Sequence, residues 1–251
     1  MPKLIVLGTA PAIPSEQQDN SHMVVVGENR TVLIDTSSNP FVRLRKAGVE
    51  PTSLTDLILT HFHPDHVSGA PLLLLDNWLA GQKEPLNVYG LADTIERFEK
   101  MMDLFGWQHW PNFYQVNLVK LPAEEMTPVL ISDEFSIYAS PVRHMIPTLG
   151  LRIEMHAAGK VVAYSCDTAP SQEVVRLAAH ANVLLHEATG DEFGHSSAAQ
   201  AGQIANQAGV ERLLLIHYDL MHNDLQKLLS QARGAFLGQV DLAQDFMVFT
   251  F

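Results

Sequence analysis

The sequence predicts an α/β (α+β) fold in which two β-sheets pack together and helices lie outside them, in one domain. The first half is rich in short strand-like runs, whereas the second half alternates strand and helix. A chain of 251 residues is long enough for one large domain with a substantial core. No internal repeat, low-complexity tract or linker divides the chain, so residues 1–251 are taken as a single domain.

Strands in the first half are predicted where β-branched and apolar runs stand between turn-forming residues. Gly48 ends the first short helix, and Pro71 weakens the second helical segment. The expected strands are Lys3–Gly8, His22–Gly27, Thr31–Asp35, Leu57–Thr60, Leu86–Tyr89 and Tyr114–Leu121. The expected helices are Pro40–Ala47 and Leu91–Leu104, and His66–Leu79 is expected to be a helix or a loop followed by a helix. The irregular loop Trp107–Asn112 is a candidate lid or contact surface.

The second half alternates strands and helices. A hairpin is expected about Ala157–Gly159, and His222 is expected to begin the last helix. The expected strands are Phe135–Ala139, Leu149–His156, Lys160–Ser165, Val183–His186, Arg212–His217 and Phe246–Phe251. The expected helices run from the Ser171 cap to His180, from the Ser196 cap to about Gly209, and from Asp224 to Phe236.

Composition narrows the class of protein. Asp and Glu number 28 against 16 Lys and Arg, and the formal charge of −12 disfavours non-specific nucleic-acid binding without excluding a local basic groove. The one cysteine, Cys166, excludes an internal disulfide framework and fits a reducing compartment. The N-terminus reads as a strand rather than a signal peptide, and no apolar stretch reaches membrane-spanning length. We therefore expect a cytoplasmic globular enzyme without a membrane partner.

The stretch His61-Phe62-His63-Pro64-Asp65-His66 is the strongest chemical signal in the chain. Imidazole nitrogens and carboxylate oxygens are ligands of zinc and similar divalent ions, and this density has little structural use. His61 and His63 point the same way in extended chain. Asp65 and His66 follow the bend at Pro64, so the pattern predicts one loop that supplies two metal ions.

Further ligands are expected where later strands end. His144, Asp167 and His217 each follow a strand region, where functional side chains usually lie in layered α/β folds. Each of these residues alone favours a structural role, such as a turn or a cap. Their combination and order with the histidine loop favour a metal site.

This order resembles the metallo-β-lactamase superfamily and, within it, the ribonuclease Z branch. The metal motif and the three later ligands match the superfamily. The branch is indicated by four further stretches, which are Leu7–Pro14, Leu33-Ile34-Asp35, His186-Glu187-Ala188-Thr189 and Gly194-His195-Ser196-Ser197. The resemblance covers nearly the whole chain.

The resemblance implies a four-layer αββα sandwich with two divalent metal ions at one edge of the sheets. Zinc is the expected ion, with manganese and iron as alternatives. The first metal would be held by His61, His63 and His144, and the second by Asp65, His66 and His217. Asp167 would bridge the two ions, and Asp35 would orient a ligand histidine or serve only as a strand-end turn residue.

The resemblance also assigns catalytic roles. Asp65 would orient a metal-activated hydroxide or accept its proton. His195 would contact the phosphate and act as an electrophile or general acid beside a helix start that favours an anion. Glu187 would orient His195 or fill a buried structural role. Cys166 is expected to be a small buried residue, and His22, His109, His156 and His180 are expected to be structural.

Two departures from ribonuclease Z bear on the substrate. The 23 positions from His144 to Asp167 leave no room for the long Gly/Pro/basic arm with which tRNA-processing members grip tRNA. Tyr218-Asp219-Leu220-Met221 replaces the Ser-x-Arg-Tyr that usually follows the last ligand, so a phosphate-contacting arginine is missing there.

Four hypotheses follow. The first is a dinuclear-metal phosphodiesterase that acts on a small phosphodiester or related ester. The second is a ribonuclease Z, the 3′-tRNA-processing endonuclease, that binds tRNA without the usual arm, as a homodimer of the kind the family resemblance implies. The third is a lactonase or thioesterase, which the His-Glu-Ala-Thr and Gly-His-Ser-Ser stretches argue against. The fourth is a non-enzymatic sensor or scaffold, which the seven intact ligand positions argue against.

Overall fold

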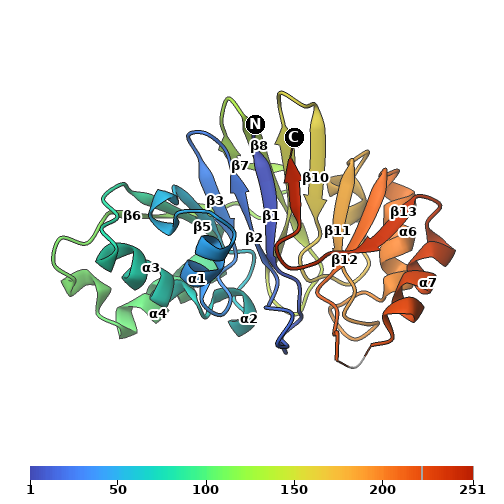
Figure 1. The fold of residues 1–251 in the computed structure, drawn as a ribbon, viewed down its shortest axis with the longest axis horizontal. Helices are drawn as coiled ribbons and strands as arrows, with labels where there is room; N and C mark the ends of the chain where they lie inside the picture. Colours follow the sequence, from blue (N-terminus) through green and yellow to red (C-terminus); the bar gives the residue numbers. More distant parts are fainter. Residues whose placement is uncertain (222, 251) are drawn as a thin grey trace.

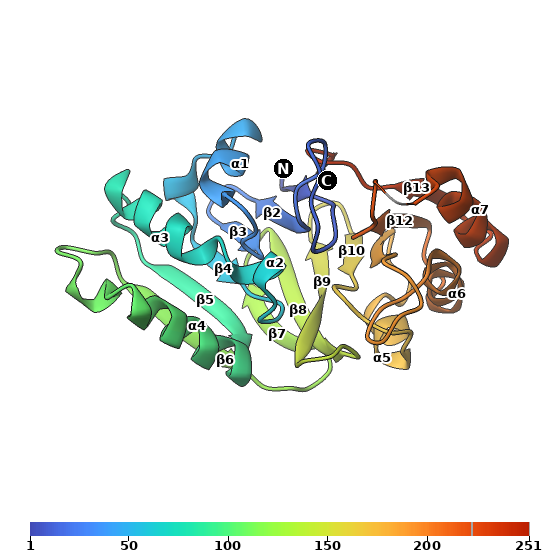
Figure 2. The same cartoon turned by 90° about the horizontal axis from the view of Figure 1, so that it is seen from below.

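Two seven-stranded sheets lie face to face between two layers of helices (Figures 1 and 2). The computed structural model describes residues 1–221 and 223–250. The expectation for His222 therefore lies outside the described residues. The four-layer αββα sandwich predicted from the sequence is confirmed.

The first sheet has the strand order β14-β1-β2-β3-β4-β5-β6. Strands β1, β2 and β3 form an antiparallel meander, and β4, β5 and β6 then continue parallel to β3. The bounds are β1 Lys3–Gly8, β2 His22–Val26, β3 Thr31–Ile34, β4 Asp56–Ile58, β5 Leu86–Leu91, β6 Val116–Leu121 and β14 Val248–Thr250.

The second sheet follows the same plan, in the order β13-β12-β11-β10-β9-β8-β7. Strands β7 to β10 are antiparallel, and β11, β12 and β13 continue parallel to β10. The bounds are β7 Thr127–Ile131, β8 Phe135–Val142, β9 Thr148–Met155, β10 Lys160–Tyr164, β11 Val183–Glu187, β12 Arg212–Ile216 and β13 Gln239–Leu242.

The helices cover the outer faces of the sheets (Figure 2). On the first sheet lie α1 Pro40–Lys46, α3 Ala70–Leu79 and α4 Ala92–Leu104. On the second lie α5 Gln172–Leu177, α6 Ala198–Ala208 and α7 Leu225–Ala235. The short elements are α2 Pro64–Val67 and the 3-10 turns η1 Pro51–Ser53 and η2 Trp107–His109. None of the described helices is long and apolar enough to cross a membrane.

Alternation along each strand builds three apolar cores. In β1, Leu4 and Val6 face the core between the sheets, whereas Ile5 and Leu7 face the helices of the first sheet. In β12, Leu214 lies between the sheets, and its neighbours in the chain face α6 and α7. Strands buried on both faces read as continuous apolar runs, which is why the central strands could be located from sequence.

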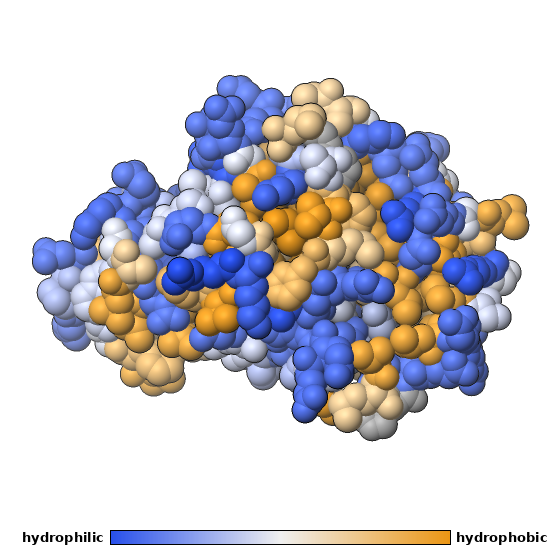
Figure 3. Space-filling model, viewed as in Figure 1, coloured by the Kyte–Doolittle hydropathy of each residue, from blue (hydrophilic) through white to orange (hydrophobic). Residues whose placement is uncertain are grey.

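The surface is mixed in character. Figure 3 shows hydrophilic and hydrophobic residues side by side, with apolar residues gathered near the centre of the face drawn. Exposed apolar side chains are common on soluble proteins, so this mixture needs no special function.

The expected elements differ from the structure mainly at their ends. The strand predicted at Leu57–Thr60 is β4, Asp56–Ile58, which frees Thr60 for a polar role. Pro71 does not weaken a helix, because it lies in the first turn of α3, where a missing N–H costs nothing. The cap of α6 is Ser197 rather than Ser196, and Ser197 forms a capping box with Gln200.

Further differences concern elements that the sequence did not mark or marked too long. Strands β7 and β13 were not expected, because Pro128 and Asp241 interrupt their apolar patterns. Helix α5 ends at Leu177 instead of His180. The closing strand β14 is Val248–Thr250 rather than a strand that starts at Phe246.

The irregular loop Trp107–Asn112 belongs to an aromatic cluster. Trp110 stacks on Trp78 of α3 with ring centroids 5.4 Å apart, and Phe113 packs edge-on against Trp110. These contacts anchor the loop on the outer helix layer rather than over the strand ends.

Candidate metal centre

The predicted ligands meet at one edge of the sandwich. Asp35 follows β3 and His61 follows β4, which are parallel neighbours in the first sheet. In the second sheet, β8, β10 and β12 point the same way, and they lead to His144, Asp167 and His217. Because carboxyl ends of co-directional strands share an edge, residues far apart in sequence become neighbours.

The first group consists of His61, His63, His144 and Asp167. His63 Nδ1 lies 3.0 Å from His61 Nε2 and 3.1 Å from His144 Nε2. Asp167 Oδ2 lies 3.9 Å from His61 Nε2 and 4.0 Å from His144 Nε2. Three ring nitrogens and one carboxylate oxygen therefore converge on one point.

The second group consists of Asp65, His66, His217 and the same Asp167. Asp65 Oδ2 lies 3.4 Å from His66 Nε2 and 3.6 Å from His217 Nε2. Asp167 turns Oδ2 toward His66, at 3.6 Å, and Oδ1 toward His217, at 3.4 Å. The structure thus brings the seven residues together in two groups that share Asp167, although metal binding by them stays a prediction.

The residues of this centre fit divalent metal ions. Within the described part of the chain, His66 Nε2, His217 Nε2 and Asp167 Oδ1 are buried and have no hydrogen-bond partner. Buried polar atoms without a partner are costly, because desolvation is not repaid. An ion bound between them would satisfy all three atoms, and nitrogen and oxygen ligands suit zinc, manganese and iron.

Four of the predicted ligand histidines are oriented by hydrogen bonds through Nδ1. His66 Nδ1 lies 2.8 Å from Asp35 Oδ2, and His61 Nδ1 lies 3.1 Å from Thr60 Oγ1, whose hydroxyl donates to Asp35. His144 Nδ1 lies 2.7 Å from the Gly194 carbonyl oxygen, and His217 Nδ1 lies 2.8 Å from Thr189 Oγ1. These contacts assign the proton to Nδ1 and leave Nε2 free to bind an ion.

The backbone is strained at three strand ends of this edge. Asp35, Cys166 and His217 have φ angles of 62°, 52° and 56°, in the left-handed region that L-residues seldom adopt. Such residues persist where surrounding contacts hold them, and they cluster at functional sites. The amide of His217 donates to Thr9 O at 2.9 Å and so fixes one of these turns.

Electrostatics keep the carboxylates ionised. Burial alone would raise the pKa of Asp65, but the imidazoles of His217 and His66 close to its carboxylate outweigh burial and hold the pKa well below its usual range. Burial also opposes ionisation of Asp167, and the charges of His217 and His66 outweigh it, so its pKa is low as well. Burial lowers the pKa of His61, which favours the neutral ring that metal binding requires.

His195 stands beside the two groups and is held by Glu187. Its ring centroid lies 4.9 Å from that of His144 and 5.9 Å from that of His217. Burial lowers the pKa of His195, but the hydrogen bond and charge of Glu187 outweigh burial and raise it. A half-buried imidazole with a raised pKa is suited to donate a proton.

An open cavity of about 650 Å³ exposes the centre to solvent. Its polar lining includes His63, Asp65, Asp167, His195 and His217, and its apolar wall is formed by Pro11, Ala12, Ile13, Pro64 and Met145. Among the described residues that line it, none is a lysine or arginine. No residue of the loop Trp107–Asn112 lines this cavity either, so the structure does not place that loop as its lid.

Other predicted roles can be compared with the structure. Cys166 is completely buried, and burial raises the pKa of its thiol well above the usual range, in keeping with a small core residue. His22, His109, His156 and His180 lie in none of the ligand groups found among the described residues. The roles of Thr60 and Thr189 were not expected from the sequence, although Thr189 lies in the stretch His186-Glu187-Ala188-Thr189.

A comparison with family models matches residues 30–218 to the beta-lactamase superfamily domain. A ribonuclease Z from Mycolicibacterium gilvum is 30% identical over 243 residues, which cover 87% of this chain and 84% of that protein.

Solved structures agree in fold. The metallo-beta-lactamase fold protein YhfI from Bacillus subtilis superposes with a TM-score of 0.84 at 23% identity, over 99% of this chain and 98% of the other. The short form of human tRNase Z superposes with a TM-score of 0.78 at 24% identity and the same coverage.

Proposed function

We propose that this chain, a hydrolase that belongs to the beta-lactamase superfamily and its ribonuclease Z-like branch, cleaves phosphodiester bonds of RNA as a ribonuclease Z does. One observation carries the proposal. Two ligand groups share Asp167, and His195 stands beside both, in hydrogen-bond contact with buried Glu187. The names of the relatives support RNA as the substrate.

Two divalent ions, with zinc proposed first, would be held by the seven residues of the two groups. Bound there, they would supply Lewis acidity toward a phosphoryl oxygen and lower the pKa of water. The chain contributes the fixed orientation of the ligand rings and the carboxylates of Asp65 and Asp167, which stay ionised at neutral pH.

His195 is proposed as the general acid. Its Nδ1 faces Glu187, so Nε2 is the atom left to donate a proton to the departing oxygen. Asp65 lines the same cavity and, besides acting as a ligand, would accept the proton of the attacking nucleophile. Glu187 is a positioning residue, because it touches His195 and backbone amides.

A small phosphodiester is the second candidate substrate. The cavity has an apolar wall and no lining lysine or arginine among the described residues, which suits a compact aryl or cyclic phosphodiester better than a polyanion. The interval from His144 to Asp167 is filled by the β9–β10 hairpin, so no arm for gripping tRNA extends from it.

The test is a paired assay with Zn²⁺ or Mn²⁺ added. Purified protein is given a precursor tRNA, a panel of cyclic and aryl phosphodiesters including bis-p-nitrophenyl phosphate, and a lactone. Cleavage at the acceptor end of the tRNA supports the ribonuclease proposal, whereas turnover of small diesters alone supports the second candidate.

His63→Ala and Asp167→Ala are expected to abolish phosphodiester cleavage. Activity that survives both changes would contradict the dinuclear mechanism. Fast lactone hydrolysis without phosphodiester turnover would contradict both candidate substrates.

A further inference from the structure

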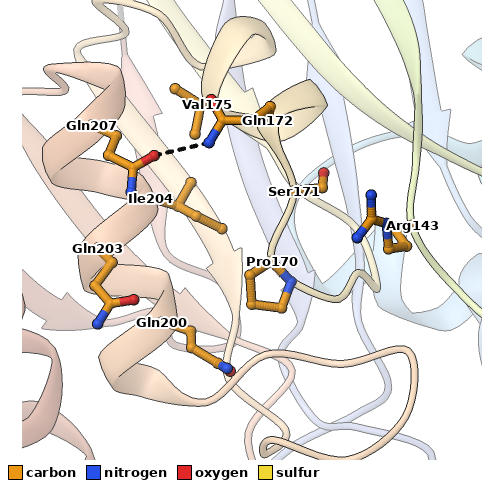
Figure 4. A pocket seen from close by; sticks show the side chains of 9 residues that line it. All are labelled: Arg143, Pro170, Ser171, Gln172, Val175, Gln200, Gln203, Ile204 and Gln207. Carbon is orange, nitrogen blue, oxygen red and sulfur yellow. Dashed lines mark hydrogen bonds between the residues drawn. The ribbon is translucent and has the colours of Figure 1, made fainter.

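A second pocket, of about 210 Å³, lies between α5 and α6 and shares no lining residue with the cavity of the metal centre (Figure 4). Three glutamines of α6, at positions 200, 203 and 207, form one side, with the three- and four-residue spacing that places them on one helix face. Gln172, Ser171 and Arg143 lie on the other side. We refer to this pocket as the glutamine groove.

The glutamine groove carries hydrogen-bonding groups that the fold leaves available. The side-chain amide of Gln172 donates to the side-chain oxygen of Gln207 at 3.1 Å (Figure 4). The side-chain oxygen of Gln172 and the side-chain NH2 group of Gln207 therefore remain available to a ligand. The Gln200 oxygen serves the α6 cap, and its amide group stays available. Gln203 is exposed, and its side chain makes no hydrogen bond to any described residue.

Arg143 is unusual among the arginines of the chain. Seven of the nine hydrogen-bond through their guanidinium groups to a carboxylate or carbonyl oxygen. The guanidinium of Arg143 is exposed and has no such partner among residues 1–221 and 223–250. Five N–H donors in a planar fork therefore face the groove without an acceptor.

The charge of the groove differs from that of the whole molecule. The chain carries a formal charge of −12, and the cavity of the metal centre is lined by acidic residues, including Glu192 and Asp219. The lining of the glutamine groove contains Arg143 and no aspartate or glutamate. A group with one negative charge is thus favoured here over the surrounding acidic surface.

The groove adjoins the metal centre through two loops. The amide of Arg143 lies 3.2 Å from Thr168 Oγ1, and its carbonyl accepts from the Ala169 amide at 2.7 Å. Arg143 directly precedes His144, and Thr168 directly follows Asp167. Neighbouring residues of the same two loops therefore belong to the predicted metal centre and to the glutamine groove.

We propose that the glutamine groove binds a nucleotide of single-stranded RNA next to the bond that is cleaved. Arg143 contacts its phosphate through the guanidinium fork, and the glutamine amides contact base edges or ribose hydroxyls. This inference rests on the proposed function, because it names how an RNA substrate is held at the same edge of the fold. It also places a phosphate-binding arginine away from the position after His217.

The test compares Arg143→Gln with Arg45→Gln, which removes the same charge. Arg45 lies in α1 on the first sheet and is exposed, and its guanidinium makes no hydrogen bond to a described residue. Binding of a fluorescent single-stranded RNA oligonucleotide is measured by anisotropy in the His63→Ala background. Arg143→Gln is expected to weaken binding by about tenfold, as for a lost charge-assisted hydrogen bond, and Arg45→Gln to leave it unchanged.

Salt dependence gives a second readout, which a purely structural role would not move. Loss of one phosphate contact should reduce the slope of log affinity against log salt by about 0.7 for single-stranded nucleic acid. A combined Gln203→Ala and Gln207→Ala variant should weaken binding and keep the salt slope. Equal binding by the Arg143 and Arg45 variants would overturn the inference, even if RNA is cleaved.

The two proposals fail in different ways. The wild-type protein could hydrolyse bis-p-nitrophenyl phosphate and bind RNA through Arg143, yet cleave no RNA. That result would contradict the ribonuclease proposal and support RNA binding in the glutamine groove. Protein that neither binds the oligonucleotide nor cleaves precursor tRNA would overturn both.

Discussion

His195 Nδ1 lies 3.0 Å from Oε1 of Glu187, a carboxylate that is completely buried. The same oxygen accepts from the amides of Thr168 and Ser196 at 3.0 and 3.1 Å, and Oε2 accepts from the Thr189 amide at 2.9 Å. Glu187 therefore joins the loop after β10 to the loop between β11 and α6 and fixes the tautomer of His195.

His195→Ala should lower kcat for RNA by about 100-fold, the usual contribution of a general acid. The loss should be smaller with bis-p-nitrophenyl phosphate, because p-nitrophenolate leaves without a proton. Stability should change little, since His195 is half-buried and its ring contacts only the site. Steady-state kinetics on both substrates provide the measurement, and equal losses on the two would refute the acid role.

Glu187→Gln should destabilise the protein by about 1–3 kcal/mol, because an amide group would face the Thr189 N–H and leave a buried donor unpaired. It should also lower kcat more than KM, since His195 loses its charged partner. Urea unfolding and kinetics measure the two effects. Thr94→Val is a suitable control, because the buried Thr94 hydroxyl has no hydrogen-bond partner in the described part of the fold. If Thr94→Val lowers kcat as much as Glu187→Gln does, the loss of activity is not specific to the site.

Most of the sandwich could be predicted because buried strands are continuous apolar runs with turn residues between them. Strands β7 and β13 could not, since Pro128 and Asp241 break the pattern, and their pairing depends on neighbours that are distant in sequence. The N-cap of α6 could not be assigned from the sequence, because Ser196 and Ser197 are adjacent and either hydroxyl could cap the helix. Ser196 instead donates to Thr168 O, a contact that only the folded chain defines.

The grouping of the site was predictable because ligand residues follow strands in a fixed order. The Nδ1 partners were less predictable, since Thr60, Thr189 and the Gly194 carbonyl are common groups whose role depends on tertiary geometry. Asp35 was expected to orient a ligand histidine or to be a turn residue. Asp35 lies at a turn with a φ angle of 62°, and its carboxylate contacts His66, one of the predicted ligands, at 2.8 Å.

Asp35→Asn should weaken zinc binding by about 10- to 100-fold, as do changes in groups that orient metal-binding histidines. Asparagine tolerates the left-handed backbone, so the variant tests the charge and hydrogen bond rather than strain. Competition with a chromogenic chelator measures the affinity.

Asp56→Asn is the matched control for this prediction. Asp56 is equally buried, but it bonds to Arg30, Asn87 and Tyr89 within the first sheet. It should destabilise the fold and keep the zinc affinity, so equal loss of affinity in both variants would contradict the role of Asp35.

Stability should depend on pH through His22, which is buried and belongs to neither ligand group. Burial lowers the pKa of His22 below its ordinary value of 6.5. The unfolded chain then binds more protons than the folded one between these two pKa values. The free energy of unfolding should therefore be highest above about pH 6.5 and fall as the pH drops below it.

His22→Gln removes this linkage and should give a smaller slope of unfolding free energy against pH in that acid range. Urea unfolding at several pH values, with chelator present, provides the slopes. Identical slopes for variant and wild type would show that His22 does not titrate on unfolding.

Removal of metal should destabilise the protein, because His66 Nε2, His217 Nε2 and Asp167 Oδ1 would remain buried without partners. An ion at 100 times its dissociation constant contributes about 2.7 kcal/mol per site. For a domain of this size, that energy corresponds to a melting-temperature difference of roughly 5–10 °C. Calorimetry with EDTA or with added zinc measures it, and His63→Ala should shrink the difference while Asp56→Asn keeps it. A melting temperature that zinc does not raise would mean that the unpaired atoms hold no ion in the folded state.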